Sequence, residues 1–141
     1  MVYYAKITRQ KGGGYLVEFP DLPGCLTEGD TMCEAKAYAR EALNGWLSVR
    51  CDRNLNIPTP TAPQGKTYVP IPVDLNVEFP IQLRTTRKKK RLTQQHVAHR
   101  LGMSQQAYAK LETPSTSNPT LKTIQKISEV LHVEIGIALA A

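Results

Sequence analysis

The sequence predicts an α+β protein, with a small β-β-β-α-β domain at residues 1–74 and an all-α domain at residues 80–141. Two observations support this prediction. In the first half, runs of β-branched and aromatic residues alternate with glycine and proline clusters, which is typical of short strands. In the second half, apolar residues recur at helical spacing in short segments. With 141 residues, 41% of them apolar, the chain is long enough for two small cores.

Three short strands are predicted in the first thirty residues. Residues 2–9, VYYAKITR, alternate in polarity, and residues 15–19, YLVEF, follow a cluster of three glycines. Two strand-like runs separated by glycines indicate a hairpin. The prolines and glycines of residues 20–30 mark turns around a very short third strand at residues 25–27.

One helix is predicted at residues 32–49, because Ala35, Trp46 and other apolar residues recur on one face. Thr31 precedes this helix and Glu34 follows three residues later, which is the spacing of a capping box. We interpret Trp46 as a core residue between helix and sheet rather than as a binding residue.

A polar, proline-rich loop at residues 52–66 and a strand at residues 67–73 complete the first domain. The prolines of this strand favour an edge position, where a missing N–H can face solvent. Residues 74–79 are expected to connect the two domains, and Pro80 is expected to begin the next helix.

The second domain is predicted to contain four helices and an apolar tail. The predicted helices are residues 80–90, 93–101, 104–112 and 121–131, with a brief turn or helix from Glu134. The tail VEIGIALAA, residues 133–141, either closes the core of the monomer or contributes to a dimer interface, and the sequence leaves both open.

The formal net charge of +6 is concentrated in the second half of the chain. Residues 67–141 carry ten basic and five acidic residues, and the run RTTRKKKR at residues 84–91 holds six of the basic ones. A basic patch confined to one half indicates that this half meets a polyanion.

No cofactor, metal or catalytic group is predicted. The three cysteines lack CxxC spacing, which indicates single thiols in a reducing compartment. His96 and His99 lie three residues apart, but no further ligand is spaced to join them. No apolar run approaches the ~18 residues of a membrane span, so we expect a soluble, cytoplasmic protein.

Residues 92–112, LTQQHVAHRLGMSQQAYAKLE, carry the spacing of a helix-turn-helix. Ala98 is small, Gly102 follows four residues later, and Tyr108 and Leu111 stand six and nine residues after the glycine. Glycine suits a turn that needs a positive φ angle, and the whole spacing is typical of the motif. With the flanking helices, this half resembles the five-helix DNA-binding domains of the Cro and repressor type.

The second helix of such a motif enters the major groove, where its N-terminal residues face base edges. Here those residues are Ser104, Gln105 and Gln106, and a glutamine amide matches the N7/N6 edge of adenine. Lys110, one turn further, is expected to reach a base or a phosphate. The resemblance implies that Gln94 holds a phosphate. The alternative is a helix-turn-helix that serves only dimerisation.

The residues of the basic run are expected to have two different roles, an internal ion pair and contacts with DNA. The repressor resemblance implies that Arg87 forms an internal ion pair with Glu112, at the end of the recognition helix. Lys88, Lys89 and Lys90 are candidates for contacts with the DNA backbone, and the alternative is a solvated helix end.

The sequence departs from the repressor pattern at two positions. Thr86 stands where the first helix usually carries an apolar residue, which predicts loose packing of that helix. Tyr108 stands where valine or isoleucine is common, and its ring can fill the core if its hydroxyl finds a partner.

The run GGGYLVEFPDLPGCLTEGDTMCEA, residues 12–35, resembles the HicB antitoxin family. The matching features are Gly-Tyr before the second strand, Asp-Leu-Pro-Gly-Cys at residues 21–25 and Thr-Glu-Gly-Asp-Thr at residues 27–31. The β-β-β-α-β order and the C-terminal helix-turn-helix also agree, so the resemblance covers the whole chain. It implies a partial RNase H-like fold for the first domain.

This resemblance implies a function that composition does not show. HicB antitoxins bind HicA toxins, which are small ribonucleases that cleave messenger RNA, and repress the operon that encodes both proteins. We therefore expect a HicA-type toxin and operator double-stranded DNA as partners. We also expect a homodimer or higher oligomer formed through the C-terminal domain.

A toxin that binds RNA is expected to be basic, so acidic groups near the turn after the second strand are candidates for its contacts. The candidate residues are Asp21, Leu22, Pro23, Glu28 and Asp30. The alternative is structural, with Asp21 stabilising a turn, Asp30 capping a helix, and Leu22 and Pro23 packing the turn.

Parts of this sequence are also compatible with two other functions, an RNase H-like enzyme and a ligand-sensing regulator. Active RNase H-like enzymes carry a carboxylate on the first strand, and residues 2–9 contain none, so we expect no enzyme. The stronger alternative is a transcriptional regulator whose HicB-like domain senses a small molecule. A neighbouring gene for a small basic toxin would distinguish an antitoxin from such a sensor.

Overall fold

The computed structural model describes residues 1–139, and the chain divides into two compact units, Met1–Glu78 and Phe79–Ala141, which are described separately. The predicted α+β class and β-β-β-α-β order are confirmed. Ala140 and Ala141, the end of the predicted tail, lie outside the described residues.

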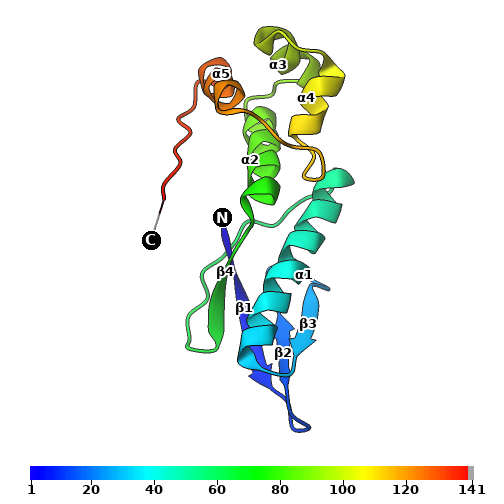
Figure 1. Cartoon of the computed structure of the whole chain (residues 1–141), viewed down its shortest axis with the longest axis vertical. Coiled ribbons are helices and arrows are strands. Elements are labelled where there is room, and N and C mark those ends of the chain that lie inside the picture. The colour runs from blue at the N-terminus through cyan, green and yellow to red at the C-terminus, as the bar shows by residue number, and fades with distance from the viewer. Residues whose placement is uncertain (140–141) are drawn as a thin grey trace. The chain divides into compact units, whose positions relative to one another are not determined.

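Four antiparallel strands form one sheet in the first unit, in the order β3-β2-β1-β4 (Figure 1). Their bounds are β1 Val2–Arg9, β2 Tyr15–Glu18, β3 Leu26–Gly29 and β4 Tyr68–Pro72. The third strand begins one residue later than predicted, at Leu26, and the carbonyl of the buried Cys25 just before it accepts the Phe19 amide at 3.3 Å. As predicted, the proline-containing strand β4 lies at an edge.

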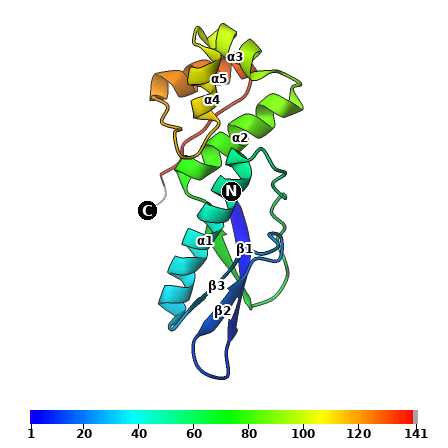
Figure 2. The same cartoon turned by 90° about the vertical axis from the view of Figure 1, so that its right-hand side faces the viewer.

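Helix α1, Met32–Asp52, covers one face of this sheet (Figures 1 and 2). Its buried residues are Ala35, Ala39, Leu43, Leu47 and Cys51. The predicted capping box forms at its start, where Thr31 Oγ1 accepts the amide of Glu34 and Glu34 Oε2 accepts the amide of Asp30. Local capping and the spacing of small and branched side chains therefore explain where this helix begins and which face it buries.

Trp46 is only partly buried, so our interpretation of it as a core residue was wrong. The Arg50 guanidinium carbon lies 4.7 Å from the centroid of the indole ring, which is a cation–π contact at the surface. A hollow of about 470 Å³ lies beside this pair. Its lining includes Cys25, Leu26, Trp46, Val49, Arg50 and Leu55.

Strand β3 approaches the first turn of α1 very closely at Gly29. A Cβ atom on Gly29 would lie 2.5 Å from the amide nitrogen of Ala35 and 2.9 Å from its Cα. Since real Cβ atoms do not come this close to backbone, glycine is required here for space and not for backbone conformation.

The proline-rich loop after α1 is held down by two side chains. The Tyr3 hydroxyl donates to the carbonyl of Pro58 at 2.6 Å. The amide and hydroxyl of Thr61 donate to the carboxylate of Asp21 at 2.8 and 2.7 Å. Burial, and then the negative charge of Asp21, raise the pKa of Tyr3 to about 12, so the phenol stays a hydrogen-bond donor.

Helix α2 runs over Leu75–Lys89, so the predicted connection at residues 74–79 and the predicted helix start at Pro80 are wrong. Pro80 is buried inside the second turn of the helix. The helix begins earlier because tertiary contacts outweigh the local signal of the proline.

The start of α2 is fixed by residues distant in sequence. The amide of Asp74 donates to Asn44 Oδ1 at 2.9 Å, and Arg40 Nε donates to Asp74 Oδ1 at 2.6 Å. The N-terminal ammonium of Met1 donates to Glu78 Oε1, also at 2.6 Å. None of these contacts could be read from the local sequence.

Three further helices complete the second unit, and the helix-turn-helix prediction is confirmed. They are α3 Gln94–Leu101, α4 Gln105–Leu111 and α5 Leu121–Leu131. Thr93 and Ser104, the predicted caps, each accept the amide three residues on, and Thr120 does the same for α5. The shared core consists of Leu83, Val97, Ala98, Leu101, Tyr108, Leu111, Ile127 and Leu131.

The described chain continues from α5 to Leu139 without regular secondary structure, so the turn or helix predicted from Glu134 is not formed. Within residues 1–139, no helix combines the length and apolar character needed to cross a bilayer.

We expect Gly29→Ala to destabilise the first unit by about 2 kcal/mol, because the added methyl group overpacks the contact with α1. Urea unfolding followed by the fluorescence of Trp46, which lies on α1, measures this loss. Gly12→Ala is the matched control, because a Cβ there meets nothing within 4 Å. Equal stability of the two variants would contradict the steric argument.

Candidate nucleic-acid interface

The turn between α3 and α4 has the geometry that the helix-turn-helix spacing predicts. Gly102 ends α3 with a φ angle of 71°, in the left-handed region that glycine adopts without steric penalty. Ala98 is 1% exposed, and its carbonyl accepts the amide of Met103 at 3.0 Å. Tyr108 of α4 is 0% exposed, so the two helices meet through small and aromatic residues at this crossing.

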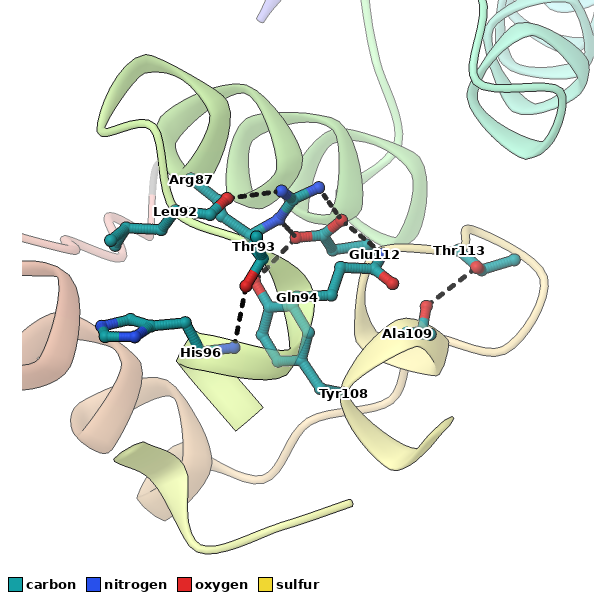
Figure 3. A network of polar contacts seen from close by, with 9 residues as sticks. All are labelled: Arg87, Leu92, Thr93, Gln94, His96, Tyr108, Ala109, Glu112 and Thr113. Atoms are coloured by element: carbon teal, nitrogen blue, oxygen red, sulfur yellow. Dashed lines mark hydrogen bonds and ion pairs between the residues drawn. The ribbon is translucent and has the colours of Figure 1, made fainter. Parts of the chain in front are cut away.

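A buried ion pair connects α2 with the end of α4 (Figure 3). Arg87 Nε and Nη2 donate to Glu112 Oε1 and Oε2 at 2.6 and 3.0 Å, which is a bidentate contact. The Tyr108 hydroxyl donates to Oε1 at 2.7 Å, and Gln94 Nε2 donates to Oε2 at 3.0 Å. Arg87 Nη1 donates to the carbonyl of Leu92 at 2.8 Å. One carboxylate therefore holds groups from α2, α3 and α4.

These contacts keep the carboxylate of Glu112 charged. Burial raises its pKa, but hydrogen bonds from Arg87, Gln94 and Tyr108, together with the charge of Arg87, lower the pKa below its usual value. The hydrogen bond to Glu112 raises the pKa of Arg87 against the effect of burial. Burial, and then the hydrogen bond to Glu112, raise the pKa of Tyr108, so its hydroxyl remains a donor.

The residues predicted to meet base edges lie at the surface. Gln105, Gln106 and Lys110 are exposed on α4. The hydroxyl oxygen of Ser104 accepts the amide of Ala107 at 3.1 Å, which leaves its O–H available as a donor. The exposed start of α4 thus offers two amide groups and one hydroxyl to a ligand.

Gln94, which the resemblance makes a phosphate-binding residue, has an internal contact in the structure. Its side chain is half-buried, and one N–H of its amide is used by Glu112. An amide carries two N–H groups, so a phosphate contact through the other one stays a prediction.

A polar hollow of about 680 Å³ lies between α3 and the start of α4. Its lining includes Thr93, Gln95, His96, His99, Gln105 and Gln106. Sequence reasoning missed Gln95, His96 and His99 as interface candidates, since it considered the histidines only as metal ligands. Helical spacing was the available signal, because these three residues fall on the side of α3 opposite its buried stripe. Within residues 1–139 no three His, Cys, Asp or Glu side chains gather to hold a metal ion.

The basic run, residues 84–91, lies at the end of α2 and forms a cationic surface there. Arg84 is buried and Arg87 is occupied by the ion pair, whereas residues 88–91 are all exposed. Four of the six basic residues therefore present positive charge to solvent.

The candidate toxin-binding residues of the first unit also differ in how far their side chains are buried. Leu22 is 0% exposed, so of the two roles that the sequence leaves open its side chain has the structural one and packs in the core beneath the turn. Asp21 is half-buried and holds Thr61 of the proline-rich loop. The exposed candidates are Pro23, Glu28 and Asp30.

Fold and site together define a class of protein in which a small α/β unit precedes a helix-turn-helix unit with an exposed, polar and cationic recognition surface. Two family models agree with this division. One is described as a HicB_like antitoxin of bacterial toxin–antitoxin systems and matches residues 3–70. The other is described as a helix-turn-helix and matches residues 83–137.

Relatives match both units of the chain at once. It is 30% identical over 139 residues to Antitoxin HicB 1 of Photorhabdus laumondii, covering 99% of this chain and 87% of the relative. It is 32% identical over 111 residues to Antitoxin HicB of Escherichia coli K12, covering 79% and 80%. The chain belongs to the HicB antitoxin family. It also matches a chain of the solved HicA3 and HicB3 toxin–antitoxin complex, with 26% identity, a TM-score of 0.40 and coverage of 45% of this chain and 73% of that one.

We expect Glu112→Gln to destabilise the second unit by about 3 kcal/mol, because it leaves the buried charge of Arg87 without its partner. Amide hydrogen exchange in α3 and α4 measures the loss, since Trp46 reports only on the first unit. Glu129→Gln, on the exposed surface of α5, is the control and is expected to be nearly neutral. A similar effect of both substitutions would show that the ion pair does not matter.

Acid is expected to weaken the same network. Because the folded-state pKa of Glu112 is lowered, its contribution to stability is present above its ordinary value of 4.5 and is lost as the pH falls through the folded-state pKa. The difference in stability between the natural chain and Glu112→Gln should therefore shrink on acidification. Exchange rates measured across a pH series test this, and a constant difference would contradict it.

Proposed function

We propose that this chain is an antitoxin that binds and neutralises a HicA-type, mRNA-cleaving toxin and represses its own operon by binding operator DNA. The observation that carries the proposal is membership of the HicB family together with a helix-turn-helix whose recognition residues are exposed. Co-expression with a small basic protein encoded beside this chain tests it, because an antitoxin restores growth and copurifies with its toxin.

The DNA-binding half of the proposal follows from groove chemistry. Helix α4 enters the major groove, and Gln105 and Gln106 reach the base edges from its first turn. A glutamine amide has both a donor and an acceptor, so it can contact the N6 and N7 atoms of one adenine. The hydroxyl of Ser104 and the ammonium of Lys110 add contacts to bases or phosphates.

Phosphate contacts set the position of the motif without reading sequence. Lys88, Lys89 and Lys90 supply the nonspecific electrostatic attraction from the end of α2. The second N–H of Gln94 binds one phosphate, with its amide oriented by Glu112. The buried ion pair therefore acts indirectly, by holding a phosphate-binding group in place.

The toxin-binding half of the proposal is located on the first unit. Glu28 and Asp30 are exposed on and just after strand β3, which forms an edge of the sheet. Leu26 of the same strand is 57% exposed. Acidic groups beside an exposed apolar side chain suit a basic protein partner, because the charges steer the encounter and the apolar group adds contact area.

A ligand-sensing regulator is the second candidate. The hollow of about 470 Å³ beside Trp46 and Arg50 favours it, because this hollow combines apolar and cationic groups. A sensor would bind a small anion there and would neither copurify with a toxin nor restore growth. We propose no catalytic role, since β1 lacks the acid that an RNase H-like enzyme needs.

We expect Gln105→Ala and Gln106→Ala each to weaken operator binding by about 5- to 150-fold, equivalent to ~1–3 kcal/mol, and to relax the preference for the contacted base. Affinity for unrelated DNA should change little. Binding assays on the operator and on scrambled DNA measure both effects. Equal losses on the two DNAs would show that these residues do not read bases.

Lys89→Ala and Lys90→Ala are expected to weaken binding to all sequences alike and to reduce the salt dependence by about one unit each. Lys126→Ala, on the exposed surface of α5, is the matched control. Titrations at several salt concentrations measure the slope, and an unchanged slope would place these lysines away from DNA.

We expect Glu28→Lys to weaken toxin binding by about tenfold, mainly through slower association. Glu41→Lys, an exposed charge reversal on α1, should leave the affinity unchanged. Association and dissociation rates measured on immobilised toxin test this. Equal effects of the two reversals would indicate a general charge effect and not a site.

A further inference from the structure

The surface beside the recognition helix carries two histidines that the proposed function does not use. His96 and His99 lie three residues apart on α3, so their Cβ atoms are about 5–6 Å apart on one side of the helix. Both side chains are exposed. In Figure 3 the imidazole of His96 points away from the network around Glu112. The two rings therefore face solvent, where a ligand can reach them.

Both histidines line the polar hollow of about 680 Å³ between α3 and the start of α4. Gln105 and Gln106, which are proposed to reach base edges, line the same hollow. When the second helix of such a motif lies in the major groove, the first helix crosses the sugar–phosphate backbone. Here α3 is that first helix, so its two imidazoles are on the element that meets phosphates.

The side-chain donors around this hollow are not used within the chain. In the part of the chain that the structure describes, neither imidazole makes a hydrogen bond or an ion pair, and the amides of Gln95, Gln105 and Gln106 make none either. The hydrogen bonds of His96 and His99 involve only their backbone atoms. A neutral imidazole has one N–H and an imidazolium has two, so proton uptake doubles what each ring can donate to an anion.

No acidic side chain of the described residues lines the hollow beside the histidines. The rest of its lining is uncharged and consists of Thr93, Gln95, Ala98, Met103, Gln105 and Gln106.

The acidic groups of the neighbouring helices have other partners. Glu112 of α4 pairs with Arg87 of α2 and also holds the Tyr108 hydroxyl. Glu129 of α5 accepts a hydrogen bond from Gln125 of the same helix. The other charged or titratable groups of α3, α4 and α5 are Arg100, Lys110, Lys122, Lys126 and the C-cap His132. An anion from outside the chain is therefore what favours the imidazolium form of the two histidines.

We propose that His96 and His99 form a site for the phosphodiester backbone of operator DNA and take up protons from solvent as the DNA binds. The inference rests on the proposed DNA-binding function and adds regulation to it, because operator affinity then rises as the pH falls. The coupling is reciprocal: a phosphate that favours the protonated ring is bound more tightly by that ring, and by the same factor.

Position and charge favour a DNA phosphodiester over a free anion as the occupant. The phosphodiester belongs to the ligand that Gln105 and Gln106 contact, so it reaches the hollow at a high effective concentration. Lysine side chains keep their charge between pH 6 and 8, whereas histidine exchanges a proton in this range. The lysines at the end of α2 thus supply a constant attraction, and the histidines of α3 supply one that varies with pH.

The test is the affinity of the full chain for its operator at pH 6, 7 and 8 and constant ionic strength. If each phosphate favours its imidazolium about tenfold, binding strengthens about 30-fold from pH 8 to pH 6 for each bound helix-turn-helix unit. The salt dependence should be steeper at pH 6 by about one to two units. The pKa of Glu112 is lowered, so the buried network keeps its charge throughout this range.

Three sets of variants separate charge from other effects. His96→Gln combined with His99→Gln removes the titrating groups and should reduce the pH effect to less than about twofold. His96→Arg combined with His99→Arg fixes the charge, and it should bind at pH 8 as tightly as the natural chain binds at pH 6. His132→Asn is the matched control, because His132 is exposed at the left-handed C-cap of α5, a conformation that asparagine also adopts. It should keep the whole pH effect.

Scrambled DNA distinguishes backbone contacts from base contacts. Phosphate contacts carry no sequence information, so scrambled DNA should show the same pH effect as the operator. A pH effect confined to the operator would mean that the imidazoles read bases, and it would overturn the phosphate site. Amide hydrogen exchange in α3 and α4 confirms that each variant is folded at each pH.

Three further results would overturn the inference. They are an operator affinity that does not change between pH 8 and pH 6, a pH effect that persists in the paired glutamine variant, and a loss of the effect in His132→Asn. In each of these cases the chain still binds its operator, so the proposed function stands. A chain that binds no operator at any pH would instead refute the proposed repression, and the histidine site with it.

Discussion

The second unit depends on one buried carboxylate. Glu112 stands at the end of α4 and receives hydrogen bonds from Arg87 of α2, Gln94 of α3 and Tyr108 of α4. A buried charge is tolerated only when it is paired and hydrogen-bonded, so these partners must stay together once the unit is folded. The three helices are held together by this requirement as well as by their apolar core. The consequence for function is that the first turn of α4 is presented in one orientation, with its polar side chains outward.

The features that sequence reasoning predicted well are those that depend on neighbours in the chain. Thr31, Thr93 and Ser104 cap helices because a hydroxyl reaches an amide three residues on, whatever surrounds it. Gly102 ends α3 because a left-handed residue is needed there. The start of α2 was missed for the opposite reason. It is set by contacts of Asp74 with Arg40 and other distant residues, and a proline within the helix gave a misleading local signal.

The candidate site was predictable to the extent that periodicity decides which side chains face outward. Gln105 and Gln106 follow from the helical pattern of α4, and both are exposed. For Leu22 the sequence left a toxin contact and packing of the turn both open, because a leucine between turn residues gives no sign of whether its side chain faces inward or outward, and the structure buries it. Gln94 shows a related difficulty. Its residue type indicates a polar contact, but only the packed structure shows that Glu112 takes one of its two N–H groups.

The small size of the recognition surface limits what one helix-turn-helix unit can discriminate. Helix α4 has seven residues, so a single unit can place only a few side chains on base edges. At ~1–3 kcal/mol for each good base contact, one unit alone discriminates weakly against the many competing sites of a genome. Two linked units bind with an effective concentration that multiplies their separate affinities. The self-association and operator binding that we propose would therefore act together, because linking two units raises occupancy without any further residue that touches DNA.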